Sequence, residues 1–414
     1  MTKNLNKQIT LITGYYYPED TAIGLYNTQM MEYLENKGYL VNVITGFPSY
    51  PQWKIRDSYK NKKPFLIEEN NQCKIYRYKQ YVPATPTFLK RILLLTDFTI
   101  GSFFNILKIK KCDVVISVVP HTSTILLGWL LKHRTNSKLW NHIQDFEFDA
   151  AKQTGISSNT KGIKKIIFKL LFKTETWLLN KGDLNSTISF SMVDKLNKKS
   201  KKESFYFPNW IDANKIDPSK LIQHNYMKSA SFKILYSGNI GEKQDWQFFL
   251  SFAKRIEAYN AEIILVGDGA KKQWLCNKIE EFKNVKYYEP IEYKDLSNLL
   301  CSADLHILFQ KNNVVDSVMP SKLLGMMASA KPSLIAGNVT SEVKKIIEES
   351  KGGFYISNES VSECVSIVDY LIKNPKEVIN LGFSARNYII TKFSAEKVLS
   401  NFEDKLSQIF TEKF

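Results

Sequence analysis

The feature that most constrains the fold is an alternation of short apolar runs with helical segments, and this pattern occurs twice. In the first half, strand-like runs lie at 9–14, 41–45, 74–78, 113–118, 138–143, 184–187 and 205–207, with helical stretches between several of them. After Asn209 the pattern restarts with runs at 232–237, 262–266, 285–288, 305–309 and 333–336. Such alternation predicts parallel sheets with crossover helices. The expected fold class is therefore α/β, with two tandem Rossmann-like domains.

The boundary between the domains is expected at the polar segment 212–231, which contains Pro218 and is interpreted as a linker. Residues 1–211 would then form an N-terminal domain and residues 232–394 a C-terminal one. The amphipathic tail, 395–414, is expected to be a helix that packs back toward the N-terminal domain. Two such domains would enclose an interdomain cleft, and ligands of doubly wound sheets bind beyond the carboxyl ends of the strands.

The formal charge of +16 invites a nucleic-acid interpretation, but only six of the 57 basic residues are arginine. Nucleic-acid readers depend on arginine for bidentate contacts. Nucleic acid is therefore not an expected partner. The five cysteines are scattered, without the spacing of a metal site or a disulfide framework, which favours a reducing cytoplasmic compartment.

Two basic and apolar stretches, 92–107 and 162–179, are candidates for membrane contact. Both are too short to span a bilayer. Lysines beside apolar residues are typical of a helix that lies at an anionic interface. The alternative is a pair of core helices with a solvated lysine edge. We expect a protein that is peripheral on the inner face of the cytoplasmic membrane.

A glycine-rich turn after the run at 232–237 is the strongest local signal for a ligand. It contains Gly238, Asn239, Gly241 and Lys243 and leads into a helix expected at 244–259. Glycines let backbone amides approach a ligand, and a helix N-terminus favours an anion. Lys243, expected in the first helical turn, could neutralise a phosphate oxygen. A merely tight connection is the alternative.

Two further turns follow strands of the second half. A base or ribose could pack at Gly267, Asp268 and Gly269, unless this is a plain βα turn. Pro320 is a favoured start for the helix expected at 321–329. Lys322 in its first turn opposes the helix dipole, a cost that an anion held between Lys322 and the amides of 321–324 would explain. A surface lysine is the alternative.

The first half offers a second group of polar candidates at strand ends. A long loop contains Tyr17 and leads to Gly24, which is expected to open a helix. His121 follows the run at 113–118. Three acids, Asp145, Glu147 and Asp149, follow the run at 138–143 and could line a cleft, orient an acceptor hydroxyl or act as a base. A solvated acidic loop is the alternative. Neither a nucleophile elbow nor a P-loop is present.

Several segments together resemble the retaining GT-B glycosyltransferases of family 4. Within that family the chain is most similar to the branch of colanic-acid, capsule and O-antigen transferases. The segments are Y-Y-Y-P-E-D-T-A-I-G from Tyr15, V-I-T-G-F-P-S-Y-P from Val43, H-I-Q-D-F-E-F-D-A-A from His142, P-N-W-I-D from Pro208, Y-S-G-N-I-G-E-K-Q from Tyr236 and M-P-S-K-L-L-G-M-M-A-S-A-K-P from Met319. The resemblance covers nearly the whole chain.

The resemblance implies a C-terminal domain that binds a nucleotide-diphosphate sugar and an N-terminal domain that receives the acceptor. It implies no cofactor and no metal. Asp145, Lys243 and Lys322 are the expected catalytic residues. Donor contacts are expected from Gly24, Gly238, Asn239, Gly241, Gly267, Asp268, Gly269, Asp316, Ser321, Leu323 and Leu324, and acceptor contacts from Tyr17, His121, Glu147 and Asp149.

The chain also departs from the family pattern. Ser317 and Gly325 stand where many members have a pair of glutamates near the donor sugar. Asn239 stands where an arginine is common, and Gln144 where many members have histidine. We expect Asp316 to replace part of the missing carboxylate function.

The resemblance implies transfer of a sugar, with retention, to a lipid-linked oligosaccharide during synthesis of capsule, O-antigen or exopolysaccharide. The acceptor lipid would be a polyprenyl diphosphate. Two alternatives stay open: a sugar-nucleotide 2-epimerase of the same architecture, and a non-catalytic subunit of a polysaccharide assembly complex.

Overall fold

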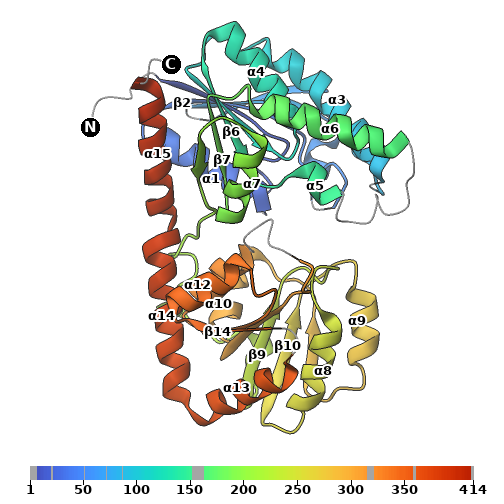
Figure 1. Ribbon diagram of the computed structural model, residues 1–414, viewed down its shortest axis with the longest axis vertical. Coiled ribbons are helices and arrows are strands. Elements are labelled where there is room, and N and C mark those ends of the chain that lie inside the picture. Colours follow the sequence, from blue (N-terminus) through green and yellow to red (C-terminus); the bar gives the residue numbers. More distant parts are fainter. Residues whose placement is uncertain are drawn as a thin grey trace. The chain divides into compact units, whose positions relative to one another are not determined.

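The computed structural model describes residues 7–19, 22–50, 52–70, 72–85, 87–151, 163–314, 321–357 and 360–411. The chain forms two compact units, residues 1–208 with 399–414 and residues 209–398. Each unit contains one sheet with helices packed on it (Figure 1).

The first unit is built on a sheet of eight strands among the described residues. Its spatial order is β3 (Phe65–Asn70), β4 (Cys73–Tyr78), β2 (Leu40–Gly46), β1 (Gln8–Ile12), β5 (Val114–Val119), β6 (Lys138–Ile143), β7 (Leu184–Thr187) and β8 (Ser204–Tyr206). β3 pairs antiparallel with β4, and the other neighbours are parallel. The strand order reverses between β1 and β5, so the topological switch point, where doubly wound sheets bind ligands, lies between these strands.

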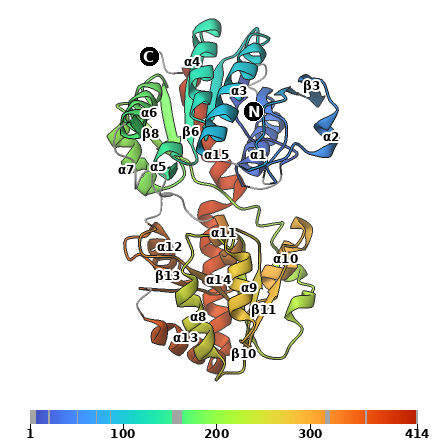
Figure 2. The ribbon, with the colours of Figure 1, turned by 90° about the vertical axis from the view of Figure 1, so that its right-hand side faces the viewer.

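One helical layer of this unit consists of three neighbouring helices. α4 (Ser123–Thr135) contacts both α3 (Phe88–Ile106) and α6 (Ile163–Leu179), and lies between them in Figure 2. The described part of residues 1–208 also contains α1 (Ala22–Asn36), α2 (Asp57–Lys60), α5 (Glu147–Ala151) and α7 (Phe190–Lys199).

The C-terminal helix, α15 (Ala395–Thr411), contributes its later part to the first unit. The ring of Phe402 stacks on Phe207 at 4.9 Å and lies 5.0 Å from Trp140. All three side chains are buried. An amphipathic helix near the end of the sequence therefore completes the core of a domain that begins at the other end.

The second unit has the strand order of a dinucleotide-binding Rossmann fold. Its six strands in the described residues run β11 (Val285–Tyr288), β10 (Ala261–Val266), β9 (Phe232–Ser237), β12 (Leu305–Phe309), β13 (Ser333–Gly337) and β14 (Gly353–Ser357), all parallel. Counted from β9, the order is 3-2-1-4-5-6, which puts the switch point between β9 and β12.

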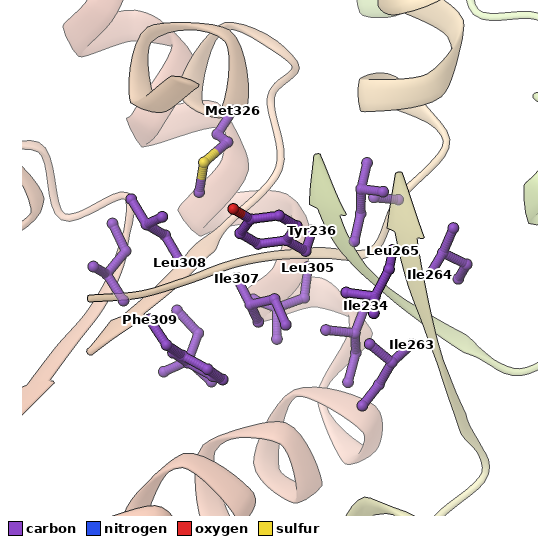
Figure 3. Close-up of a cluster of buried hydrophobic side chains, with 14 of the residues drawn as sticks. Ile234, Tyr236, Ile263, Ile264, Leu265, Leu305, Ile307, Leu308, Phe309 and Met326 are labelled. Atoms are coloured by element: carbon purple, nitrogen blue, oxygen red, sulfur yellow. The ribbon is translucent and has the colours of Figure 1, made fainter. Parts of the chain in front are cut away.

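Helices cover this second sheet. α8 (Trp246–Ile256) contacts α9 (Lys272–Ile279) and α13 (Val361–Lys373), whereas α14 (Pro375–Phe393) contacts α11 (Ser321–Ala328) and α12 (Glu342–Ser350). The described part of this unit also contains the short helix α10 (Leu296–Cys301). Side chains of β9, β10 and β12 fill the core between these layers (Figure 3). Burial on both faces explains why these strands are nearly continuous apolar runs in the sequence.

The expected linker, residues 212–231, packs against the second unit. Ile216 and Met227 are buried in the core of the second unit. The backbone amides of residues 217, 222 and 224 donate hydrogen bonds to Ser297, Asn298 and Ser302, in and just after α10. This packing was not predicted, because the segment has few apolar residues among many polar ones.

The sequence pattern overlooked two strands, β3 and β14. β3 is largely exposed at the sheet edge and β14 is only partly buried, so neither is a strong apolar run. Among the described helices, none is both long enough and apolar enough to cross a membrane.

Candidate functional site

The donor candidates of the second unit meet at its switch point. The loop after β9 contains residues 238–245, the loop after β10 contains residues 267–271, and α11 follows β12. These segments lie at the carboxyl edge of the sheet, where ligands of such folds bind.

Lys322 on α11 reaches back to the end of β9. Its Nζ donates a hydrogen bond of 2.9 Å to the hydroxyl of Tyr236 and one of 3.3 Å to the carbonyl oxygen of Asn239. The ammonium also lies 4.6 Å from the centre of the Tyr236 ring. Tyr236 in turn donates to the Asn239 carbonyl at 2.6 Å, and Figure 3 shows its hydroxyl pointing toward α11, near Met326. The lysine is therefore held by neutral partners.

Burial lowers the pKa of Lys322 to about 8. Within the described residues, no carboxylate lies in ion-pair distance of its ammonium. Desolvation without a counter-charge disfavours the protonated form, and a bound anion would restore it. The local electrostatics therefore favour an anionic ligand beside Lys322.

Two glycines, Gly238 after β9 and Gly267 after β10, allow the close packing of Lys322 and of the two loops. A Cβ on Gly238, whose φ is 132°, would lie 2.8 Å from Nζ of Lys322. A Cβ on Gly267 would lie 2.9 Å from the carbonyl carbon of Gly238. The amide of Gly238 donates to the carbonyl oxygen of Val266 at 2.8 Å. Gly267 needs glycine because the backbone of Gly238 lies against it, and Gly238 needs glycine because of its positive φ and the side chain of Lys322.

Further backbone contacts connect the loop after β9 with the loop after β10. Ile240 donates its amide to the carbonyl of Asp268 at 2.8 Å. Gly269, with a φ of 154°, leaves no room for a Cβ between its backbone and Asn239. The amide of Gly241 donates to Gln244. Gly241, Asp268 and Gly269 thus shape the edge of the site, while Asn239 and Gly238 lie next to Lys322.

The expected position of Lys243 in a helix is wrong. α8 begins at Trp246, because the Asp245 side chain accepts the amide of Phe248 at 3.0 Å and caps the helix. Lys243 is exposed in the turn before this cap. Its neighbour Glu242 pairs with Lys271 at 3.0 Å and with Lys311 at 3.8 Å. Lys243 is therefore an exposed charge on the loop before α8.

The start of α11 offers backbone groups more than side chains. Leu323 and Leu324 are fully buried in the core, so only their amides could serve a ligand. First-turn amides of a helix have no partner within that helix. Asp316 lies outside the described residues, and so does the side chain of Ser321.

A second group of candidates lies at the switch point of the first unit. The ring of His121, just after β5, packs against the backbone of Gly14 after β1, and a Cβ on Gly14 would lie 2.5 Å from its Cε1. Tyr15 and Phe98 pack on the same ring, with centroids 5.4 and 5.2 Å away. Burial lowers the pKa of His121 to about 4, and its Nδ1 has no hydrogen-bond partner among the described residues. His121 is therefore a buried, neutral ring at the switch point of the first unit.

The loop after β1 is held by a residue that sequence reasoning missed. Buried Glu19 accepts the amides of Ser49 and Tyr50 at 2.7 and 2.8 Å. A Cβ on Gly24, in the first turn of α1, would lie 2.7 Å from the Glu19 carbonyl oxygen. Tyr17 is 59% exposed on the same loop. A carboxylate after a Tyr-Pro pair in a long loop was the available signal for this clamp.

Two of the three predicted acids, Glu147 and Asp149, have hydrogen-bond or ion-pair partners within the fold. Glu147 accepts the amide and the hydroxyl of Thr122 at 2.8 and 2.9 Å, at the start of α4. Burial raises its pKa, although these hydrogen bonds oppose the shift. Its carboxylate caps a helix.

Asp149 forms ion pairs with Lys195 and Lys199 at 2.8 and 2.5 Å, and Lys199 also pairs with buried Glu175. Burial opposes ionisation of Asp149, but the two lysines outweigh it and lower its pKa. The cluster joins α5, α6 and α7. Spacing along the sequence could not reveal these partners, because they lie dozens of residues away.

Asp145 lies at the carboxyl end of β6, partly buried, one residue after Gln144. The Gln144 amide contacts Nε2 of His142 at 2.9 Å, and Nδ1 of His142 contacts the hydroxyl of Ser186 at 2.9 Å. Burial lowers the pKa of His142 to about 3, so this ring is neutral. Asp145 therefore lies beside a buried, neutral histidine at the end of this strand.

No group of three or more His, Cys, Asp or Glu side chains in the described residues could hold a metal ion.

Comparison with known proteins adds to this geometry. The family model described as Glycosyl transferases group 1 matches residues 220–388. An Escherichia coli (strain K12) protein, provisionally named the colanic acid biosynthesis glycosyl transferase WcaI, is 31% identical over 400 residues, 94% of this chain and 96% of that protein.

Solved structures share the fold. Sucrose-phosphate synthase from Thermosynechococcus elongatus matches with a TM-score of 0.72 at 14% identity, over 98% of this chain and 99% of that one. Anabaena HepE in complex with UDP matches with a TM-score of 0.65 at 11% identity, over 97% of this chain and 100% of that one. The chain therefore belongs to the glycosyl transferases of group 1, the retaining family 4 enzymes with the GT-B fold.

Proposed function

We propose that this glycosyltransferase moves a sugar from a nucleotide-diphosphate donor to a polyprenyl-diphosphate-linked saccharide, during synthesis of a bacterial surface polysaccharide. The observation that supports a diphosphate donor best is Lys322. Its ammonium is desolvated, is held only by neutral partners among the described residues, and lies beside the glycines at the switch point.

The proposed chemistry is electrostatic. As the bond between the sugar C1 and the diphosphate oxygen breaks, negative charge grows on the leaving group, and Lys322 and the first-turn amides of α11 would stabilise it. The acceptor oxygen forms its bond to C1 on the same face, and its proton passes to the leaving phosphate oxygen. Lys243 would contribute long-range attraction, and Asp145 would orient the acceptor.

The relatives suggest which substrates to test first. HepE structures contain UDP and UDP-glucose, which makes UDP-sugars the first donors to test with this chain. The name of the Escherichia coli relative points to exopolysaccharide of the colanic acid type. A lipid-linked acceptor would place the enzyme at the inner face of the cytoplasmic membrane, with anionic lipid as a partner.

The test is a transfer assay with a panel of radiolabelled UDP-, GDP- and dTDP-sugars and polyprenyl-diphosphate saccharides extracted from polysaccharide-producing cells. We expect label to enter the lipid fraction with one donor, and Lys322→Gln to abolish that transfer. Conversion of the donor sugar into its 2-epimer without transfer would identify an epimerase instead. Binding of no donor at all would support a non-catalytic subunit.

A further inference from the structure

α3 has two apolar faces. Its buried stripe contains Leu94, Phe98 and Ile106, which pack into the core. Its exposed side bears a second stripe at helical spacing: Leu89, Leu93, Ile100, Phe103, Phe104 and Leu107. Leu93 and Phe104 are 53% and 50% exposed. The second stripe runs about 27 Å along the helix. It stays largely exposed, although the ring of Phe104 packs edge to face on Phe65 of β3 at 6.3 Å.

α6 repeats this arrangement on the far side of α4. Phe168, Leu178 and Leu179 are buried, whereas Ile166, Leu170 and Trp177 are exposed, with Leu170 at 63%. Both helices contact α4, which lies between them in Figure 2. The two exposed stripes therefore belong to one helical layer.

The charges that flank these stripes are of one sign. Exposed basic residues are Lys90, Arg91, Lys108, Lys110, Lys111, Lys169 and Lys173. The two acids of these helices are occupied: Asp97 accepts hydrogen bonds from the hydroxyl of Tyr78 and the amide of Tyr81, and buried Glu175 pairs with Lys199. In the described part of α3 and α6, no acid remains exposed to oppose an anionic partner.

We propose that the exposed stripes of α3 and α6 form a docking surface for an anionic phospholipid bilayer. Apolar side chains would enter the boundary between headgroups and acyl chains, and the lysines would meet the phosphates. This inference rests on the proposed function, because a lipid-linked acceptor needs the enzyme at a membrane. The single sign of charge favours lipid over a second copy of this chain, since two such surfaces facing each other would repel.

The second unit offers a matched control surface. Ile379 and Phe383 of α14 are exposed to 69% and 70%, one turn apart, and Glu377 lies in the same helix. They resemble the α3 residues in size and exposure, but an acid accompanies them. Substitutions there test whether any exposed apolar pair on a helix suffices.

The experiment is co-sedimentation of the full chain with phosphatidylglycerol or phosphatidylcholine vesicles. We expect binding to the anionic vesicles only, falling at least about tenfold between about 50 and 500 mM NaCl. The affinity of L93E/I100E/F104E for phosphatidylglycerol vesicles should be at least tenfold lower. K169E/K173E should lose most of the part of this affinity that depends on the NaCl concentration. I379E/F383E should bind within twofold of the unmodified protein. Thermal melts of each variant would verify folding.

Unchanged binding of L93E/I100E/F104E, or no binding by the unmodified chain, would overturn the proposal. A dimer that this variant converts to a monomer, with vesicle binding unchanged, would assign the surface to a second copy. Nucleotide-sugar binding in solution is measured in parallel on the same variants. Vesicle binding without nucleotide-sugar binding would support the docking surface and contradict the proposed donor. Nucleotide-sugar binding without vesicle binding would contradict only the docking surface.

Discussion

Nζ of Lys322 lies 2.9 Å from the phenol oxygen of Tyr236, and the same lysine packs against Gly238, a residue with a positive φ. This arrangement brings a strand end, a glycine turn and a helix start to one point of the second sheet. It holds a cation in place before any anion binds. Preorganisation of this kind lowers the cost of stabilising charge during a reaction.

Lys322→Gln should lower kcat/KM by at least about 100-fold, because it removes the charge proposed to stabilise the leaving diphosphate. The thermal midpoint without ligand should not fall, since the substitution also removes a desolvated charge. Lys376→Gln, on the exposed start of α14, is the control and should leave both quantities unchanged. Equal losses of stability and activity would assign Lys322 a structural role.

The pH dependence of donor binding follows from the pKa of Lys322, which burial lowers to about 8 from an ordinary value of 10.5. Between these two values the unfolded chain keeps a proton that the folded protein has lost. The free energy of unfolding should therefore rise with pH across this window, relative to Lys322→Gln.

Donor affinity should show the opposite trend. A diphosphate needs the protonated amine, so the affinity for UDP should fall above about pH 8, by up to about tenfold per pH unit. Titration calorimetry in buffers with different ionisation enthalpies should detect proton uptake on binding at pH 9. A pH-independent affinity would contradict the role of Lys322.

Gly238→Ala and Gly267→Ala should both destabilise the protein by about 1–3 kcal/mol and weaken donor binding. Each new Cβ would press on the other loop or on Lys322. Gly325→Ala in α11 is the matched comparison, because its Cβ would meet only side-chain ends, Cδ1 of Leu300 at 3.3 Å and Cδ1 of Ile216 at 3.7 Å. That substitution should be neutral or stabilise by up to about 1 kcal/mol. Urea unfolding of the three variants checks the order.

Glu147→Ala should lower the free energy of unfolding by about 1–2 kcal/mol, because it leaves the amide and hydroxyl of Thr122 without their acceptor. Transfer activity per folded molecule, measured well below the melting temperature, should stay within about threefold. A 100-fold loss of activity at unchanged stability would instead make Glu147 a catalytic base.

The sequence predicted the architecture well because central strands such as β5, β10 and β12 are buried along their whole length. Such strands are nearly continuous apolar runs, and helical segments separate them in the sequence. β3 escaped because its side chains are mostly exposed at an edge. The start of α8 escaped because Asp245, not the glycine turn, caps the helix.

The donor site could be predicted as a set of loops, but its interior could not. Glycine and lysine motifs indicated Gly238, Gly267 and Lys322, whereas the part played by Tyr236 depends on a contact 86 positions along the chain. The acids of the first unit show the same limit. The sequence around Glu147 and Asp149 does not reveal their partners, Thr122 and Lys199, because these residues are distant in the sequence.

The most direct test of the central claim is a calorimetric titration of the full chain with UDP-, GDP- and dTDP-sugars, with Lys322→Gln in parallel. The account predicts that at least one nucleotide sugar binds the unmodified protein and that Lys322→Gln weakens this binding at least tenfold. Equal affinities in the two proteins, or no binding of any nucleotide sugar, would contradict it.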